Sequence, residues 1–252
     1  MNPLAVITLA FAFAAMPRIA IIIDDIGDRE ADGIRATLLT GPVALAFLPH
    51  APFTPTLAER AHAQQKEVML HLPLQALSGK ALGPGAIMLD TSEAEFRRVL
   101  DADLASVPHV SGVNNHMGSL LTRHPGHMGW LMAELRARAP LFFVDSYTAV
   151  ESVAFALAAE SGVPATRRDV FLDTDPSPEQ VAVQFERLLA VARSEGSALG
   201  IGHPYPATLE LLERELPRLA LEHGVELVTV RELIAYRSSA YPNAVTPAAP
   251  TR

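Results

Sequence analysis

Two neighbouring aspartates, Asp24 and Asp25, stand directly after an apolar run at positions 19–23. Two carboxylates a few ångströms apart normally force one of them to protonate, so such a pair at the end of a buried strand requires an explanation. A bound divalent cation would keep both ionised, and one aspartate could then bind the ion while the other transfers a proton. The alternative is that the pair caps a helix beginning near residue 28.

Polar side chains follow four further apolar runs in the same way. These are His71 after KEVML, Asn115 and His116 after SGVN, Asp145 after LFFV, and His203 after ALGIG. Taken singly, a histidine beside a strand is more often a hydrogen-bonded structural residue than a ligand, and Asp145 could begin a helix or a turn. Their shared position favours a site, because the carboxyl ends of the strands in a parallel α/β barrel form the face that carries the active site.

One aspartate and two neutral imidazoles form a common ligand set for a catalytic zinc ion that keeps an open position for water. The sequence therefore predicts that Asp25, His71 and His116 bind a divalent metal ion, with zinc as the expected one. Asp24 would then act as the base toward a metal-activated water.

Short β-rich runs alternate with helix-like segments from residue 18 onward, which is typical of βα units around a parallel sheet. The expected strands cover 18–23, 43–47, 67–70, 109–113, 141–144, 198–201 and 226–228. The expected helices cover 28–39, 54–65, 92–105, 125–139, 152–161, 178–194 and 206–223, and the stretches 77–87 and 173–178 are expected to be loops. The 252 residues suit one α/β domain.

The formal net charge of −8, without a long Lys/Arg cluster, disfavours binding to nucleic acid or anionic lipid. The absence of cysteine excludes disulfides, thiolate nucleophiles and Cys-based zinc sites.

Residues 1–16 resemble a secretory leader, because an apolar stretch ends in small residues, although no basic residue precedes Arg18. A buried first strand or helix is the alternative, and the stretch is too short to span a bilayer comfortably. We expect a periplasmic or secreted protein with no stable membrane insertion beyond this leader. The small, polar and Pro-rich residues 238–252 predict a flexible tail.

The motifs IIIDDIGD, KEVMLHLPLQ, GVNNHMGS, FFVDSYT and GIGHPYPATL, in this order and spacing, resemble those of the divergent polysaccharide deacetylase family, distant relatives of NodB-type carbohydrate esterases. The resemblance covers roughly residues 18–236. It implies a distorted (β/α) barrel of about seven parallel strands, which would occupy residues 17–237. It also implies removal of N- or O-acetyl groups from a cell-wall or related polysaccharide, with a divalent metal, often zinc.

The family's Asp-Asp motif falls on Asp24 as the base and Asp25 as a metal ligand. Its last motif falls on His203 as the general acid, and Asp145 resembles the acidic residue that orients and tunes that histidine. Backbone N–H groups near HMGS are expected to hold the oxyanion.

The parent pattern also has two histidines four residues apart, of which His71 is the first and Gln75 replaces the second. An Arg-Pro-Pro-Tyr motif expected further on is replaced by VNNHMGS. His116 has no counterpart in that pattern, and it restores the count of three protein ligands if its side chain points inward.

The function expected from these residues is metal-dependent deacetylation of a cell-envelope polysaccharide or a peptidoglycan-related substrate. A catalytically inactive glycan- or metal-binding barrel in cell-wall assembly is the main alternative, favoured by Gln75, by the replaced motif and by an aromatic content of only 6%. A phosphoester hydrolase ranks last, because two-metal phosphatases need more ligands and cationic clamps, and only Arg123, Arg167 and Arg168 lie in loop-like places.

Overall fold

The computed structural model describes residues 16–138 and 140–240. The predicted leader therefore lies outside the described residues except for Met16, and so does the tail beyond Ala240. The strands are β1 (Arg18–Ile26), β2 (Ala44–Phe47), β3 (Val68–Leu74), β4 (Val110–Met117), β5 (Phe142–Asp145), β6 (Ala165–Arg167), β7 (Val170–Phe171), β8 (Ser197–Gly202) and β9 (Glu226–Leu227). The α-helices are α1 (Glu30–Thr37), α2 (Thr54–Ala63), α3 (Glu93–Ser106), α4 (Pro125–Ala137), α5 (Ala154–Glu160), α6 (Pro178–Glu195), α7 (Pro206–Glu215) and α8 (Val230–Ala240).

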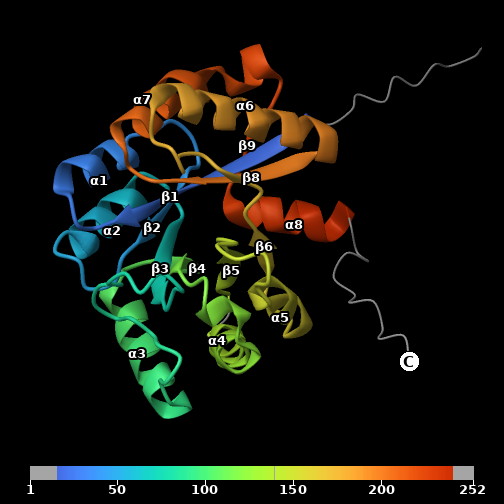
Figure 1. Ribbon diagram of the computed structural model, residues 1–252. Coiled ribbons are helices and arrows are strands. Elements are labelled where there is room, and N and C mark those ends of the chain that lie inside the picture. The colour runs from blue at the N-terminus through green and yellow to red at the C-terminus, as the bar shows by residue number, and fades with distance from the viewer. Residues whose placement is uncertain (1–15, 139, 241–252) are drawn as a thin grey trace, which may run out of the picture.

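All strand pairs are parallel, in the order β6-β5-β4-β3-β2-β1-β8-β7, and β9 pairs with the start of β1. The short strands at the two edges are almost consecutive in the chain. Asp145 pairs with Arg167 on one side, and Val170 pairs with Gly200 on the other. A single segment therefore connects the two edges of the curled sheet, and the α/β class and distorted barrel predicted from the sequence are confirmed (Figure 1).

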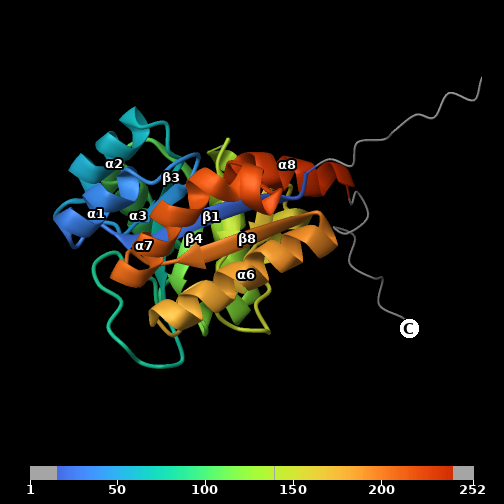
Figure 2. The ribbon, with the colours of Figure 1, turned by 90° about the horizontal axis from the view of Figure 1, so that it is seen from above.

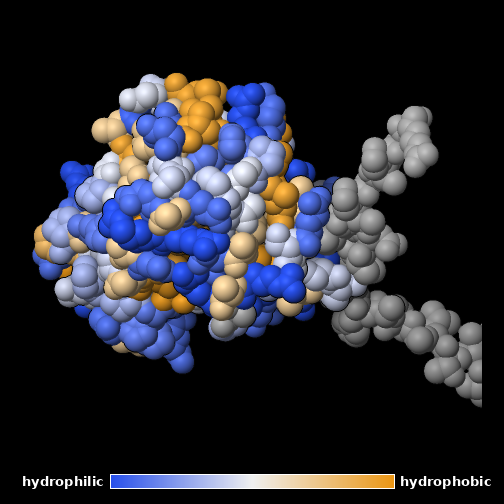
Figure 3. Space-filling view, turned by 90° about the horizontal axis from the view of Figure 1, so that it is seen from below, coloured by the Kyte–Doolittle hydropathy of each residue, from blue (hydrophilic) through white to orange (hydrophobic). Residues whose placement is uncertain are grey.

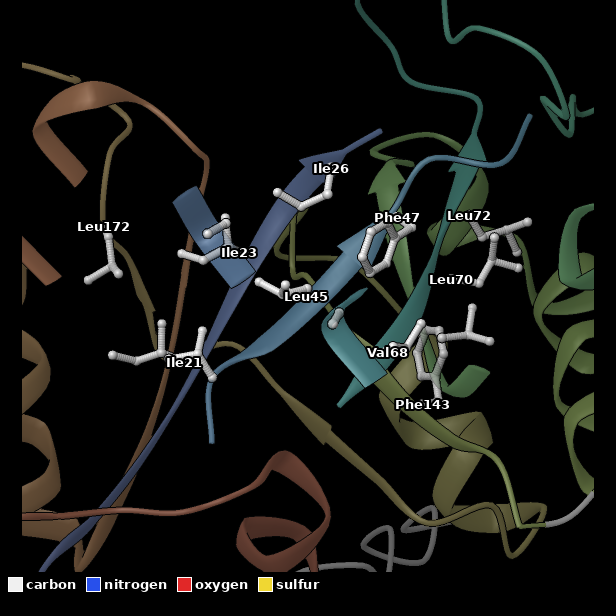
Figure 4. Packing of buried hydrophobic residues seen from close by; sticks show 14 of the residues in the cluster. Ile21, Ile23, Ile26, Leu45, Phe47, Val68, Leu70, Leu72, Phe143 and Leu172 are labelled. Carbon is white, nitrogen blue, oxygen red and sulfur yellow. The ribbon is translucent and has the colours of Figure 1, made fainter. Parts of the chain in front are cut away.

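The apolar side chains on the outer face of the barrel pack against the surrounding helices. In β1, Ile19, Ile21 and Ile23 are fully buried in this layer, beside Leu45 and Phe47 of β2 (Figure 4). Because side chains alternate between the two faces of a strand, the residues between them point into the barrel.

The barrel interior is filled by a second, smaller apolar cluster. Its strand residues include Ala20, Ile22 and Met69, and α8 contributes Leu233 and Ile234. Helix α8 thus closes the base of the barrel, opposite the carboxyl ends of the strands, which form the mouth (Figure 2). Toward the mouth, the side chains that point into the barrel become polar. In β1 Asp24 comes two residues after Ile22, and in β3 His71 comes two residues after Met69.

The sequence did not predict α8, β6 or β7. The carboxylate of Glu67 accepts hydrogen bonds from the backbone N–H groups of Val230 (2.6 Å) and Arg231 (3.2 Å) at the start of α8. This contact comes from a residue more than 160 positions away in the chain. A local capping box also marks the start of α8, since Glu232 N–H donates to Thr229 Oγ1 (3.0 Å) and Thr229 N–H donates to Glu232 Oε2 (2.9 Å). The predicted helix 206–223 was too long, because Pro217 follows the end of α7 and the chain continues as short 3₁₀ and π turns.

The surface on the side of α3 and α4 is largely hydrophilic, with scattered apolar residues (Figure 3). On α3, Arg97 pairs with Glu93, and Arg98 pairs with Glu95. Within the described part of the chain, no helix combines the length and the apolar character needed to cross a membrane.

Candidate functional site

A bulge near the end of β1 explains the two adjacent aspartates. The pairing of β1 with β2 shifts register between Ile23 and Ile26, and Asp25 adopts a left-handed backbone conformation with φ of 57°. Consecutive side chains of a regular strand point to opposite faces, but the bulge turns both carboxylates toward the mouth. Asp24 Oδ2 lies 3.6 Å and Asp25 Oδ1 3.2 Å from the same atom, His71 Nε2.

Three strands bring Asp25, His71 and His116 together. Asp25 Oδ1 lies 2.9 Å from His116 Nδ1, and His116 Nδ1 lies 3.1 Å from His71 Nε2. These three atoms could hold one metal ion. Asp25 Oδ1 is buried and makes no hydrogen bond with good geometry to a described residue, and a cation bound between it and the two imidazoles would satisfy it. The residues therefore fit a divalent ion with one carboxylate and two imidazole ligands.

Asn114 fixes the tautomer of His71. Its Oδ1 accepts a hydrogen bond from His71 Nδ1 (2.8 Å), while its Nδ2 donates to Asp24 Oδ1 (2.8 Å) and contacts Ser146 Oγ (3.3 Å). With the proton of His71 on Nδ1, the lone pair of Nε2 is free for a metal ion. One buried amide thus orients both a candidate ligand and the candidate base.

We expect replacement of Asn114 by Leu to lower zinc affinity by about 10- to 100-fold, because the imidazole of His71 loses the acceptor that orients it. Competition with a chromophoric chelator measures this affinity. Ser146→Ala is the matched control, since it removes only the longer contact of Asn114 and should change the affinity far less. An unchanged affinity in Asn114→Leu would contradict the role given to this amide.

The two aspartates have different electrostatic environments. Burial raises the pKa of Asp24, whose side chain is almost inaccessible, and the opposing charges of His71 and His203 only partly offset this. Burial would also raise the pKa of Asp25, but the nitrogens of His116 and His71 outweigh it and hold that pKa well below its usual range. Asp25 is therefore suited to bind a cation, and Asp24 to accept a proton.

His203, at the end of β8, is held by Asp173. Asp173 Oδ1 lies 2.9 Å from His203 Nδ1, and its Oδ2 accepts hydrogen bonds from the backbone N–H of His203 (2.6 Å) and from Thr208 Oγ1 (2.7 Å). Although burial would lower it, Asp173 and the charge of Asp24 raise the pKa of His203 to about 9. His203 Nε2 lies 3.7 Å from Asp25 Oδ2, so a protonated imidazole faces the candidate metal site.

The expectation that Asp145 orients His203 needs correction. The Asp145 carboxylate instead accepts hydrogen bonds from the backbone N–H of Tyr147 (2.8 Å) and from Ser152 Oγ (2.6 Å), and so shapes the loop after β5. The acid that pairs with His203 is Asp173, because the strand beside β8 is β7. Two-residue β7 is too short to be recognised as a strand, although VFLD repeats the pattern of an apolar run ending in an acid.

Two hollows flank the candidate metal site. One, of about 160 Å³, is lined by Asp25, Arg29, His203 and Tyr205, among others. The other, of about 230 Å³, lies between the 48–51 segment, the loop at 81–84 and His116. Asp25 belongs to both linings, so both hollows border the candidate metal site.

Gln75 has no contact with the three candidate ligands among its hydrogen bonds to described residues. Its Oε1 accepts a hydrogen bond from the backbone N–H of Leu89 (2.7 Å), and its backbone N–H donates to the carbonyl of Ile87 (3.0 Å). Gln75 therefore anchors the long loop beside the second hollow. His116 occupies the third position in the candidate ligand set.

Comparisons with known proteins agree with this architecture. The chain is 35% identical over 197 residues to the protein YibQ of Escherichia coli. This match covers 78% of the chain but only 61% of YibQ, so the chain spans less than two thirds of that relative's length. Its fold is similar to that of ATU2773 from Agrobacterium tumefaciens (TM-score 0.82, 22% identity, 89% of this chain and 92% of that one).

The fold is also similar to that of the catalytic domain of peptidoglycan N-acetylglucosamine deacetylase from Eubacterium rectale (TM-score 0.51, 18% identity, 87% of this chain and 94% of that one). At this identity the likeness shows a shared NodB-like fold. The family model of the divergent polysaccharide deacetylases matches residues 21–234, which include every strand-end residue of the site. The chain therefore belongs to the divergent polysaccharide deacetylase family.

Proposed function

We propose that this protein is a metal-dependent deacetylase that removes acetyl groups from a cell-envelope polysaccharide, with zinc as its metal. The observation that carries the proposal is the convergence of Asp25, His71 and His116, with Asp24 and His203 beside them at one barrel mouth. The fold shared with a peptidoglycan deacetylase supports it. A periplasmic or secreted location is part of the proposal, supported by the leader-like residues 1–16.

A divalent ion held by the three ligands supplies a Lewis acid that polarises the acetyl carbonyl and makes water more acidic. Asp24 accepts the proton of the attacking water, since burial makes this carboxylate a stronger base than an exposed one. His203, kept protonated by Asp173, donates a proton to the leaving amine or alkoxide. We assign stabilisation of the oxyanion to backbone N–H groups near Met117 and Gly118, where the chain turns with φ of 51° and 90°.

Acetate release tests the proposal. The zinc-loaded protein should release acetate from N-acetylglucosamine oligomers or from acetylated sugar esters, and chelator treatment should abolish this until zinc is restored. The proposal fails if the zinc-loaded protein releases no acetate from either class or from acetylated muropeptides.

An inactive glycan- or metal-binding barrel is the second candidate. The replacement of the second family histidine by Gln75 and of the next motif by VNNHMGS favours it. Substitution of Asp24 separates the two candidates, as argued in the Discussion.

We expect Asp173→Asn to lower kcat by about 10- to 100-fold, because the amide no longer supports a protonated His203. The pKa of His203, about 9, is raised by the Asp173 carboxylate. Loss of this carboxylate should lower that pKa and so move the alkaline limb of the pH profile of kcat to lower pH. A pH series of initial rates measures both effects. Asp145→Asn is the control, because it also removes the charge of a buried acid at a strand end, and it should leave the alkaline limb in place. An unshifted limb in Asp173→Asn would contradict the proposal that Asp173 keeps His203 protonated.

A further inference from the structure

A third hollow, which the proposed mechanism does not use, lies on the other side of His203. This open hollow of about 630 Å³ is lined by residues of three segments: the loop after β5, the β6–β7 segment and helix α6. We call it the Arg168 pocket, and its lining includes Tyr147, Thr148, Arg168, Phe171, Gln184 and Arg187. Its volume lies in the range of about 300–1,000 Å³ common for small-ligand sites.

The Arg168 pocket borders the candidate catalytic centre through two of its lining residues. The rings of Phe171 and His203 have their centroids 5.3 Å apart. On the other side, Thr148 Oγ1 donates a hydrogen bond of 2.8 Å to the carbonyl of Met117, the neighbour of His116. A group bound in this pocket would therefore lie one residue away from both the candidate acid and a candidate ligand.

Arg168 is held in position by two backbone carbonyls and an aromatic ring. Its Nε and Nη2 donate hydrogen bonds to the carbonyls of Ser146 (2.7 Å) and Tyr147 (2.9 Å), and its guanidinium lies 4.8 Å from the centroid of the Phe171 ring. The carboxylates of Asp24, Asp145 and Asp169 favour its charge at longer range, but none of the described acidic side chains forms an ion pair with it. A guanidinium fixed in this way loses little freedom when it binds an anion.

Two further arginines stand at this pocket without an ion pair to a described residue. Arg167 stacks on the ring of Tyr147 at 4.9 Å, and Arg187 lines the pocket from α6. Neither guanidinium makes an ion pair or a hydrogen bond with a residue that the structure describes. The acidic lining residue, Asp169, is bound to Arg237 (2.6 Å). Three guanidinium groups without an ion pair in the described part of the chain therefore lie together beside the mouth of a barrel whose chain has a net charge of −8.

From this arrangement we propose that the Arg168 pocket binds an anionic group, a carboxylate or a phosphate, carried by a sugar adjacent to the one that is deacetylated. The inference rests on the proposed function and adds to it that the substrate is an acidic glycan. Planar guanidinium groups match both carboxylate and phosphate oxygens, so the chemistry of the pocket admits either source.

The test compares three matched N-acetylglucosamine oligomers: one with a lactyl carboxylate on one sugar, one with that carboxylate converted to a neutral amide, and one with a phosphate instead. Dissociation constants are measured by calorimetry on the zinc-loaded Asp24→Asn protein, so that turnover does not interfere. We expect the carboxylate or the phosphate oligomer to bind about tenfold tighter than the amide, and the tighter of the two identifies the source of the anion.

Arg187→Gln, made in the same background, should remove most of that preference while the amide oligomer binds as before. Arg187 is exposed and makes no ion pair or hydrogen bond with a described residue, so this variant should fold and remains informative even if Arg168→Gln does not fold. Arg193→Gln is the matched control, since it removes the same charge from the same helix, where Arg193 donates to the carbonyl of His223.

Equal affinities for all three oligomers, or a preference that survives in Arg187→Gln, would overturn the inference. Acetate release from the amide oligomer by the wild-type protein tests the proposed function separately. Charge-dependent binding without any acetate release would support the pocket and reject the deacetylase, whereas acetate release with equal affinities would reject the pocket alone.

Discussion

Replacement of Asp24 by Asn is expected to lower kcat for acetate release by about 10²- to 10⁴-fold while the protein keeps its zinc. The amide has the shape of the carboxylate and can still accept the hydrogen bond from Asn114 Nδ2, but it cannot take a proton from water. The zinc should remain, because Asp24 Oδ2 lies 3.6 Å from His71 Nε2, beyond the three converging ligand atoms. Initial rates and the metal content of the purified variant measure the two quantities.

Asp101→Asn provides the matched control, since Asp101 is exposed on α3 and pairs with Arg138. It should change neither the rate nor the metal content. Undiminished acetate release by Asp24→Asn would refute the role of Asp24 as base. If the wild-type protein binds zinc and glycan but releases no acetate, and Asp24→Asn binds both equally well, the inactive barrel is the correct interpretation.

Replacement of His116 by Ala should lower zinc affinity by well over about 100-fold, because one of three protein ligands disappears. Loss of a residue that only supports a ligand costs about 10- to 100-fold. His116 is partly exposed at the mouth, so the substitution leaves the apolar interior intact and the protein should remain folded. Calorimetric titration with zinc measures the loss. Anomalous scattering at the zinc edge would locate the ion in the wild-type protein between Asp25, His71 and His116.

Gln75→Ala is the informative comparison, because Gln75 stands where the parent family has its second histidine. Its side chain binds the backbone N–H of Leu89, so its loss should loosen the loop and leave zinc affinity almost unchanged. If zinc affinity falls in Gln75→Ala and survives in His116→Ala, the ligand set proposed here is wrong.

Much of the fold could be predicted from the sequence because the barrel strands β1, β3 and β8 are long apolar runs. In a parallel sheet such runs end at one face, so the approach of His71 to Asp25 follows from topology alone. The edge of the barrel could not be predicted in this way. Strands β6 and β7 have three and two residues, and their pairing partners lie on opposite sides.

This gap explains which site residues were missed. Asp173 follows β7, and without that strand the family resemblance pointed to Asp145 as the partner of His203. Asn114 was not predicted, although it lies in β4 like His116 and its spacing of two from His116 places both on the inward face. Its role depends on the contact with His71 in the neighbouring strand, which is a property of the assembled sheet.

The closed base of the barrel determines how the domain would be oriented if it were attached to another structure. The start of β1 and the helix α8 both lie at that base, and the mouth opens in the opposite direction (Figure 2). Any tether joined to either end of the domain would therefore hold it at the base, with the mouth directed away from the attachment point. Such an orientation would keep the candidate metal site accessible to a large partner.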